Sequence, residues 1–349
     1  MTLSPIKTAV IGYGFSAKTF HIPFLTTLDE FELVAVSTSK REVKDDWPEV
    51  QYYDLAADLL TLSDAELVII TAPNDVHFQL AETALENGKH VIIEKPFVTD
   101  VADGEALIAL AKEKGLVLSI YHNRRWDGDF LTVKKMINEQ RFGELKHFES
   151  HFDRFRPEVR QRWREQTTEG GGILFDLGSH LLDQTLTLLG LPEAISADCK
   201  VMRQGSINVD YFHLILHYPT HLAVLHGDMF SAGPNKRFTI KGTDGSYEKY
   251  GLDPQEERLI AGNLPDTDDW SEEEPSQYGN FYDAKGCIAV ATERGCYQEY
   301  FHQISKAIRT SSACPVTAED ALLNILLIEL AIESSRLGKK LFIKDFPRK

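Results

Sequence analysis

Cysteine is scarce in this sequence, and its few cysteines follow no recognisable pattern. There are four, Cys199, Cys287, Cys296 and Cys314, with no C-x-x-C pair and no regular spacing. Zinc sites and disulfide frameworks depend on such spacing, so we expect neither, and no metal in the functional site. Unpaired thiols are typical of reducing compartments, and we therefore predict a cytoplasmic protein.

Positive charge and long apolar runs are lacking as well. The sequence has 37 lysines and arginines against 53 aspartates and glutamates, a net charge of −16. Nucleic acids are bound by basic surfaces, so we do not expect one as a partner. The apolar stretch at 325–332 contains Glu329 and is too short to span a bilayer. Residues 1–5 lack the basic and apolar regions of a signal peptide, and we expect no membrane partner.

The N-terminal third of the sequence alternates between two kinds of segment. Short apolar, β-branched runs alternate with helical patterns, which predicts an α/β domain with a parallel sheet and helices on both faces. The predicted strands are 7–12, 33–36, 67–70, 90–94 and 117–121, and the clearest helix is 101–114. A single core rarely exceeds about 250 to 300 residues, so the 349 residues suggest two domains, at 1–121 and 122–349.

A glycine-rich turn follows the first predicted strand. It reads Gly12-Tyr13-Gly14-Phe15-Ser16-Ala17, and its glycines permit a tight bend and close approach of backbone N–H groups to a pyrophosphate. The position between a strand and a helix favours a dinucleotide site, with contacts from Gly12, Gly14, Phe15 and Ser16. The alternative is a strand–helix turn that binds nothing. Pro23 is expected to end or kink the following helix.

The end of the second predicted strand indicates which dinucleotide binds. An acidic residue there would bind the ribose 2′-hydroxyl of NAD. The sequence instead reads Ser37-Thr38-Ser39-Lys40-Arg41, and its hydroxyls and cations suit a 2′-phosphate. We therefore predict NADP(H) in preference to NAD(H), with Ser37, Thr38, Ser39 and Arg41 as contacts. The alternative is that Lys40 and Arg41 only lie on the surface.

Three further strand ends carry polar residues. Ligands of an open parallel sheet bind outside the carboxyl ends of its strands, so we predict that these residues face the cofactor or, for Arg124, the substrate. They are Thr71, Pro73, Asn74 and His77 after strand 67–70, Glu94 and Lys95 of Glu94-Lys95-Pro96 at the end of strand 90–94, and Asn123 and Arg124 after the last strand. A solvated ion pair of Glu94 with Lys95 is the alternative.

The C-terminal two thirds of the sequence have a strand-rich pattern. Segments 194–201, 211–217, 222–229 and 238–241 alternate apolar and polar residues, which predicts an antiparallel sheet with one covered face. The other face would be open, and we predict that it forms the interface of a homo-oligomer, a dimer or tetramer. Further predicted elements are a helix at 130–139, a strand at 145–155, closing helices at 300–309 and 319–338, and an acidic loop at 263–286.

One helix in this part combines glycines, carboxylates and a histidine. It follows Gly170-Gly171-Gly172, and at about 100° per residue four polar residues share one stripe of an otherwise apolar helix: Asp176, His180, Asp183 and Thr187. Histidine is easily poised for proton transfer near neutral pH, and an aspartate one turn earlier can orient its ring. A catalytic pair is one interpretation, and a solvated polar seam is the other.

Together these stretches resemble the family that includes glucose–fructose oxidoreductase and inositol dehydrogenase (Gfo/Idh/MocA). The resemblance rests on the glycine turn, on Glu94-Lys95-Pro96 and on the helix with Asp176 and His180, and it covers nearly the whole length. Within the family, the sequence is most similar to NADP-dependent scyllo-inositol 2-dehydrogenases, through stretches at 122–127, 155–159, 162–165 and 249–256. Ala17 stands at the third glycine of the turn, where alanine is tolerated.

The resemblance implies a Rossmann domain joined to an α/β domain with a large, open, mostly antiparallel sheet. It implies that Lys95 contacts the reacting hydroxyl, that His180 is the acid/base, and that Asp176 orients it and binds substrate. Arg124 is also expected to contact substrate. The expected reaction is reversible hydride transfer between NADP(H) and a secondary alcohol of a cyclic polyol or sugar. The alternatives are a non-catalytic NADP(H)-binding regulator and a glycosidase that uses transient oxidation.

Overall fold

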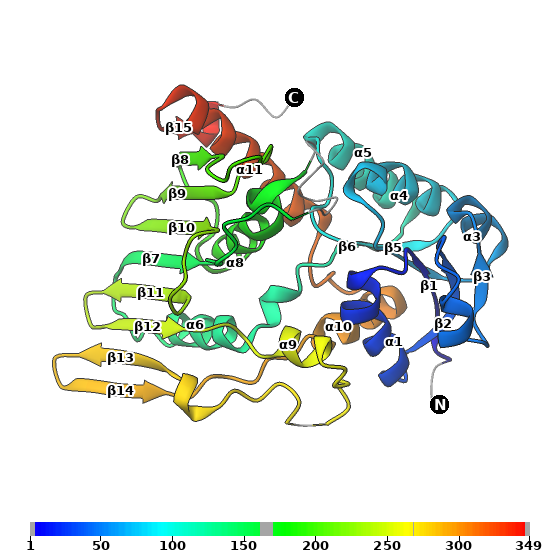
Figure 1. Cartoon of the computed structure of the whole chain (residues 1–349), viewed down its shortest axis with the longest axis horizontal. Helices are drawn as coiled ribbons and strands as arrows, with labels where there is room; N and C mark the ends of the chain where they lie inside the picture. The colour runs from blue at the N-terminus through cyan, green and yellow to red at the C-terminus, as the bar shows by residue number, and fades with distance from the viewer. Residues whose placement is uncertain (1–3, 161–169, 268, 346–349) are drawn as a thin grey trace. The chain divides into compact units, whose positions relative to one another are not determined.

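The computed structural model describes residues 4–160, 170–267 and 269–345. The chain forms two compact units, each combining segments that lie far apart in the sequence. The first unit consists of Met1–Asn123, Pro254–Ser271 and Cys296–Leu322, and the second of Arg124–Asp253, Glu272–Gly295 and Leu323–Lys349. Each unit contains one β-sheet (Figure 1).

The first unit contains a six-stranded sheet in the order β3-β2-β1-β4-β5-β6, with every neighbouring pair parallel. The strands are β1 (Ile6–Ile11), β2 (Phe31–Ser37), β3 (Gln51–Tyr53), β4 (Leu67–Ile70), β5 (His90–Ile93) and β6 (Leu118–Ile120). The order reverses between β1 and β4, and such a switch point is where open α/β sheets bind ligands. The predicted Rossmann-type parallel sheet is confirmed.

Helices cover both faces of this sheet, with α4 and α5 on one side and α1 and α10 on the other (Figure 1). The helices are α1 (Ile22–Thr27), α2 (Val43–Asp46), α3 (Ala56–Leu62), α4 (His77–Glu86), α5 (Val101–Lys114), α9 (Gln255–Ile260) and α10 (Gln298–Thr310). Helix α5 has the predicted bounds because its signals are local. The Asp100 side chain accepts a hydrogen bond from the Ala102 backbone at 2.7 Å, and Gly115 ends the helix with φ +66°.

The helical segment does not end at Pro23, one of the two predicted outcomes, but its geometry is broken just before Pro23, at His21 with φ −122° and ψ −59°. A π-helical turn over Ala17–His21 precedes α1, and the Ile22 backbone N–H bonds to the Ala17 carbonyl. Pro23 therefore lies in the first turn of α1, where its missing N–H costs no intrahelical hydrogen bond. The segment continues to Thr27.

The second unit contains a nine-stranded sheet in the order β14-β13-β12-β11-β7-β10-β9-β8-β15. Only the central pair, β7 with β10, is parallel, so the predicted mostly antiparallel sheet is confirmed. The strands are β7 (Leu145–His151), β8 (Ala194–Lys200), β9 (Tyr211–His217), β10 (Leu222–Asp228), β11 (Lys236–Gly242), β12 (Ser246–Tyr250), β13 (Gly279–Asp283), β14 (Gly286–Val290) and β15 (Leu341–Phe342).

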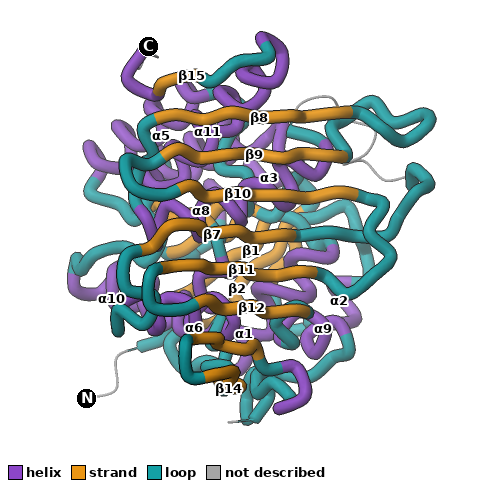
Figure 2. Tube along the Cα trace, turned by 90° about the vertical axis from the view of Figure 1, so that its left-hand side faces the viewer, coloured by secondary structure: helices purple, strands orange, loops and turns teal. Residues whose placement is uncertain are grey.

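Among the described residues, helices of this unit cover only one face of the sheet. Residues of α6 (Gly128–Asn138), α8 (Ser179–Leu189) and the C-terminal part of α11 (Ala318–Leu337) form one apolar core with inward-facing strand residues such as Phe148, Leu214 and Leu225. Figure 2 looks onto the opposite face, where the strands stand in front of these helices. That face is called the open face below.

A β-bulge in β11 turns an arginine toward the covered face. The pairing of β11 with β12 shifts between Lys236 and Phe238, so Arg237 lies on the same side as Phe238. Its guanidinium is fully buried and donates hydrogen bonds to Asp129 of α6 at 3.0 Å, Ser150 of β7 at 2.7 Å and Gln184 of α8 at 2.7 Å. This one side chain joins both helices to the sheet.

The acidic segment 263–286 is not a continuous loop, so that prediction was wrong for its C-terminal part. Residues Gly279–Asp283 form β13, which pairs with β12 and turns into β14. Gly279 and Phe281 face inward there; the acidic composition of the segment concealed this short alternation. Residue 268 lies outside the described residues. So does the stretch 162–165, which was used for the family resemblance. No helix in the described ranges is long and apolar enough to cross a membrane.

Candidate active site

The glycine turn at the end of β1 is shaped by its neighbours at the switch point. Gly12 has φ +99°, and its backbone N–H donates to the Ser37 carbonyl of β2 at 2.8 Å. A Cβ on Gly12 would lie 2.6 Å from Thr71 Oγ1, so only glycine fits. A Cβ on Gly14 would have no described heavy atom within 4 Å, which leaves its backbone accessible. This cradle suits a pyrophosphate.

Glu94 joins this turn to the segment that follows β5. Its buried carboxylate accepts hydrogen bonds from Ser16 Oγ and from the Lys95 backbone N–H, and it lies 2.8 Å from His21 Nε2. Burial by itself would raise the pKa of Glu94, but the hydrogen bonds from His21 and Ser16 lower it to about 2. Glu94 is therefore a buried anion and not a solvated carboxylate.

His21 was missed by sequence reasoning. It lies in the π-helical turn, fully buried, with its ring 4.2 Å from the Tyr121 ring between centroids. The available signal was a histidine less than two turns after the glycine motif, where a helix packs against the sheet. Its effect is to hold the Glu94 anion beside the turn.

The polar residues after β4 lie at the same edge of the sheet. His77 is fully buried, with Nε2 3.0 Å from the Ala72 carbonyl and Nδ1 3.0 Å from the Pro96 carbonyl. Burial lowers the pKa of His77, and the contacts to the two carbonyl groups oppose that shift. The imidazole thus links the two segments after β4 and β5. Asn74, in the 3₁₀ turn Asn74–Val76, and Asn123 are also buried.

The residues predicted to bind a 2′-phosphate follow β2 and differ in exposure. Ser37 is buried, whereas Ser39 and Arg41 are exposed. The Thr38 hydroxyl accepts from the Lys40 backbone N–H at 3.2 Å. Arg41 forms an ion pair with Asp54 at 3.0 Å, with its side chain 66% exposed. Asp54 was not considered from the sequence, and it competes with any anion for Arg41.

In the second unit, the helix with Asp176 and His180 begins with a distortion that the sequence did not reveal. Gly172, with φ +81°, packs so closely on the Val209 carbonyl that a Cβ would lie 2.6 Å from it. A π-helical turn over Leu174–Gly178 follows, and α8 starts only at Ser179. The prediction of one regular α-helix with a 100° stripe is therefore wrong for Asp176. π-turns inside helices are frequent at functional sites.

The four residues of the predicted stripe differ in their surroundings. Asp176 is partly exposed, and its carboxylate lies 3.6 Å from the guanidinium of Arg154. His180 is 6% exposed and Asp183 1% exposed, so a solvated seam does not describe them. Asp183 accepts two hydrogen bonds from Arg125, at 2.8 and 2.7 Å. This bidentate pair, which sequence reasoning missed, ties α8 to the segment before α6.

Arg124, predicted to contact substrate, is buried within its unit. Its guanidinium lies 3.6 Å from Asp127 and 5.4 Å from the centre of the Phe152 ring, and its backbone carbonyl accepts from Gln184 Nε2 at 2.6 Å. Burial raises the pKa of Asp127. Arg124 and Arg125 thus both contact α8, one through its backbone and one through its side chain.

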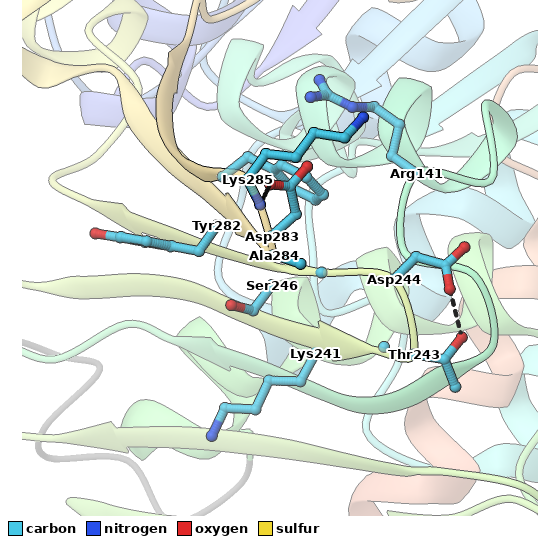
Figure 3. Close-up of a pocket in the computed structure, with 12 residues that line it drawn as sticks. Arg141, Lys241, Thr243, Asp244, Ser246, Tyr282, Asp283, Ala284 and Lys285 are labelled. Carbon is cyan, nitrogen blue, oxygen red and sulfur yellow. Dashed lines mark hydrogen bonds between the residues drawn. The ribbon is translucent and has the colours of Figure 1, made fainter.

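A wide pocket of about 870 Å³ in the second unit lies elsewhere (Figure 3). It is formed by the turns that join β11 to β12 and β13 to β14, with Arg141, Lys241 and Lys285 around it. Figure 3 draws two hydrogen bonds there: the Thr243 hydroxyl donates to Asp244 at 3.1 Å, and the Lys285 backbone N–H donates to the Asp283 carboxylate at 2.7 Å. Its described lining residues include none of the candidate site residues, and we do not assign the chemistry to it.

Comparisons with known proteins cover both units. Residues 6–122 match the NAD-binding Rossmann fold of the Gfo/Idh/MocA oxidoreductase family, and residues 134–343 match its C-terminal α/β domain. The chain is 44% identical to the uncharacterized oxidoreductase YdgJ of Escherichia coli K12, over 95% of this chain and 96% of that protein. It is 39% identical to the scyllo-inositol 2-dehydrogenase (NADP(+)) IolW of Bacillus subtilis 168, over 97% and 96%.

Two solved structures are also similar to this chain over nearly its whole length. The putative oxidoreductase yvaA from Bacillus subtilis superposes with a TM-score of 0.95 at 39% identity, covering 98% of this chain and 99% of that one. The YPO2259 putative oxidoreductase from Yersinia pestis gives 0.93 at 42% identity, covering 99% of both. The switch-point cradle and these likenesses lead to one conclusion: the chain belongs to the Gfo/Idh/MocA family of oxidoreductases and is an NAD(P)-dependent dehydrogenase.

Proposed function

We propose that this protein transfers hydride between NADP(H) and a secondary alcohol or ketone of a cyclic polyol or sugar similar to scyllo-inositol. The observation that carries the proposal is the Glu94 anion, which fixes the Lys95 backbone beside the glycine turn. The substrate class is supported by the likeness to IolW, whose name states both substrate and cofactor.

The cofactor would be held largely by backbone. Gly12 and Gly14 suit the pyrophosphate because nothing but glycine fits at the first and the second is uncovered. Ser37, Thr38, Ser39 and Arg41 would bind the 2′-phosphate, with Arg41 giving up part of its pairing to Asp54. Further proposed contacts come from the side chains or backbone of Phe15, Ser16, Thr71, Pro73, Asn74, His77, Glu94 and Asn123. When bound, the nicotinamide donates or accepts the hydride.

The chain's own residues would handle the proton and the charge on oxygen. The His180 imidazole takes the hydroxyl proton during oxidation and returns it during reduction, and Asp176 orients the ring or a neighbouring substrate hydroxyl. The Lys95 ammonium stabilises the developing alkoxide, an effect worth roughly 3 to 4 kcal/mol in comparable sites. Positioned acid–base groups typically contribute about 100- to 10,000-fold. Arg124 is the fourth proposed substrate contact.

The open face of the second unit's sheet is the surface we propose for homo-oligomerisation, as a dimer or tetramer. Its nine strands lie in front of the described helices of this unit (Figure 2). The cytoplasmic location and the absence of nucleic-acid and membrane partners remain predictions from the sequence.

A substrate screen tests this function. The purified protein would be assayed with inositols, aldoses and their keto forms against NADP⁺, NADPH, NAD⁺ and NADH, following nicotinamide absorbance. We expect turnover with a polyol or sugar and faster turnover with the phosphorylated cofactor. Turnover only with another carbonyl class contradicts the substrate, and tighter binding of NAD(H) contradicts the cofactor. NADP(H) binding without any turnover identifies a regulator, and sugar release without net redox change identifies a glycosidase.

A further inference from the structure

The open face of the second unit's sheet carries a row of histidines that the dehydrogenase function does not use. His151 of β7 pairs in register with His226 of β10, which pairs with His213 of β9, which pairs with Asp198 of β8. Residues in register project from the same face of a sheet. These four side chains therefore form a line across strands β7, β10, β9 and β8.

Asp153, just beyond β7, brings two of these histidines together. One carboxylate oxygen lies 2.9 Å from His151 Nδ1, and the other lies 2.7 Å from His226 Nδ1. The two rings are 4.9 Å apart between centroids. Ligand atoms of His151, Asp153 and His226 all lie within 4.8 Å of one another, and their side chains are only 10 to 14% exposed. Three metal-binding groups thus converge in a partly shielded position.

Glu149 supports this cluster from behind. Its Oε1 lies 2.8 Å from His151 Nε2, and its Oε2 contacts His147 Nε2 and Lys236 Nζ, both at 3.1 Å. A neutral imidazole has one N–H, whereas His151 faces a carboxylate at each ring nitrogen. When Nε2–H donates to Glu149, Nδ1 has no proton and faces the Asp153 carboxylate with its lone pair. That contact is favourable only if Nδ1 binds a second proton or a metal ion. A carboxylate behind a ligating histidine is the arrangement that orients metal-bound imidazoles.

We propose that His151, His226 and Asp153 bind a divalent transition metal ion of the zinc type, through Nδ1 of each histidine and one carboxylate oxygen. Two imidazoles and a carboxylate are a frequent zinc ligand set, and water would complete a tetrahedron. Ligands of a tetrahedral zinc lie roughly 3.3 Å apart. The two histidines now contact different oxygens of Asp153, at 2.9 and 2.7 Å, so the carboxylate would have to turn until one oxygen faces the metal ion. None of the three residues belongs to the proposed catalytic site, so the proposal does not depend on the substrate or the cofactor.

Zinc titration of the full-length protein, produced without a histidine tag and stripped with a chelator, tests the site. Calorimetry should show one saturable zinc ion per chain. His226→Gln and Asp153→Asn should each weaken binding by at least tenfold, since even supporting groups behind a ligand are worth about 10- to 100-fold. Glu149→Gln should weaken zinc binding by an amount within that range of about 10- to 100-fold. His213→Gln is the matched control, because His213 lies in the same row but is not among the three ligands. The zinc affinity of this variant should equal that of the wild type.

Two outcomes of the zinc titration would overturn the site. One is a wild-type protein that binds no zinc, and the other is binding that His226→Gln and Asp153→Asn leave unaltered. Cobalt(II) gives a second readout, since a thiolate-to-metal absorption band would assign binding to cysteine and also refute the proposal. Thermal unfolding of each chelated variant checks its fold, and His151→Gln replaces any variant that is unfolded.

Discussion

The candidate site residues fall into two halves, one in each unit, and each half is held by different means. In the first unit, backbone groups at the ends of parallel strands surround a glycine turn, and one buried carboxylate, Glu94, fixes that turn. In the second unit, a distorted helix is held by side chains, through the pair of Arg125 with Asp183 and the contact of Arg154 with Asp176. A backbone-built half tolerates many side-chain changes, whereas a half built from ion pairs depends on each partner.

The largest expected effect tests whether both halves serve one reaction. Lys95→Ala and His180→Ala should each lower kcat/KM by about 100- to 10,000-fold, because each removes a group that acts on the transferred proton or the developing charge. NADP(H) binding, measured by fluorescence titration, should be largely retained. Lys112→Ala, exposed on α5, is the control. Full activity in both test variants would refute the assignment.

The next effect tests how far the second half depends on its ion pair. Arg125→Met leaves the Asp183 carboxylate buried without its guanidinium, and should lower the free energy of unfolding by about 3 to 5 kcal/mol. Urea unfolding followed by circular dichroism measures this. Arg336→Met removes an exposed pair with Glu333 and should cost far less. Equal losses in the two variants would show that the Arg125 pair does not hold α8.

A third effect is a pH dependence located in the first half. The pKa of Glu94 is lowered from 4.5 to about 2 in the folded protein. Its stabilising contribution is therefore complete above the unfolded pKa and is lost as pH falls from about 4.5 toward 2. At about 1.4 kcal/mol for each pKa unit, it amounts to about 3 kcal/mol.

Glu94→Gln should remove this dependence. The variant should be less stable than the wild type at pH 7, and the difference should shrink on acidification through that window, as measured by denaturant unfolding at several pH values. Glu66→Gln, at an exposed position before β4, should leave the wild-type profile unchanged. A constant difference at all pH values would contradict the role given to Glu94.

The smallest effect concerns cofactor choice. Arg41→Ala should weaken NADP(H) binding by about tenfold, about 1.4 kcal/mol, and leave NAD(H) binding unaltered, because only the former has a 2′-phosphate. Lys114→Ala, exposed at the end of α5, is the control. Comparable losses for both cofactors would show that Arg41 does not read the 2′-phosphate.

How much of the fold the sequence could predict depends on whether an element is determined by local signals or by pairing with distant neighbours. The strand at Leu67–Ile70, the strand at Tyr211–His217 and helix α5 have the bounds expected from apolar runs, alternation and capping residues. Those signals are local. The three-residue strand β3 and the hairpin strands β13 and β14 were missed because short edge elements are decided by pairing with neighbours and leave little periodicity.

Site residues divide in the same way. Polar residues after parallel strands could be expected at one sheet edge, because the topology brings those ends together. The partners His21, Arg125 and Asp54 could not, because pairing between residues far apart in the sequence has no sequence pattern. Asp176 was placed on a regular helix because a π-turn inserts one residue into a turn without any signature in composition.

The bulged arginine of β11 has a consequence for how the second unit assembles. Arg237 finds partners on α6, β7 and α8 at once, and a buried guanidinium that lacks them is strongly destabilising. No subset of these elements can pack well around it. We therefore expect the helix that carries His180 to reach its final position together with the centre of the sheet, in one cooperative step.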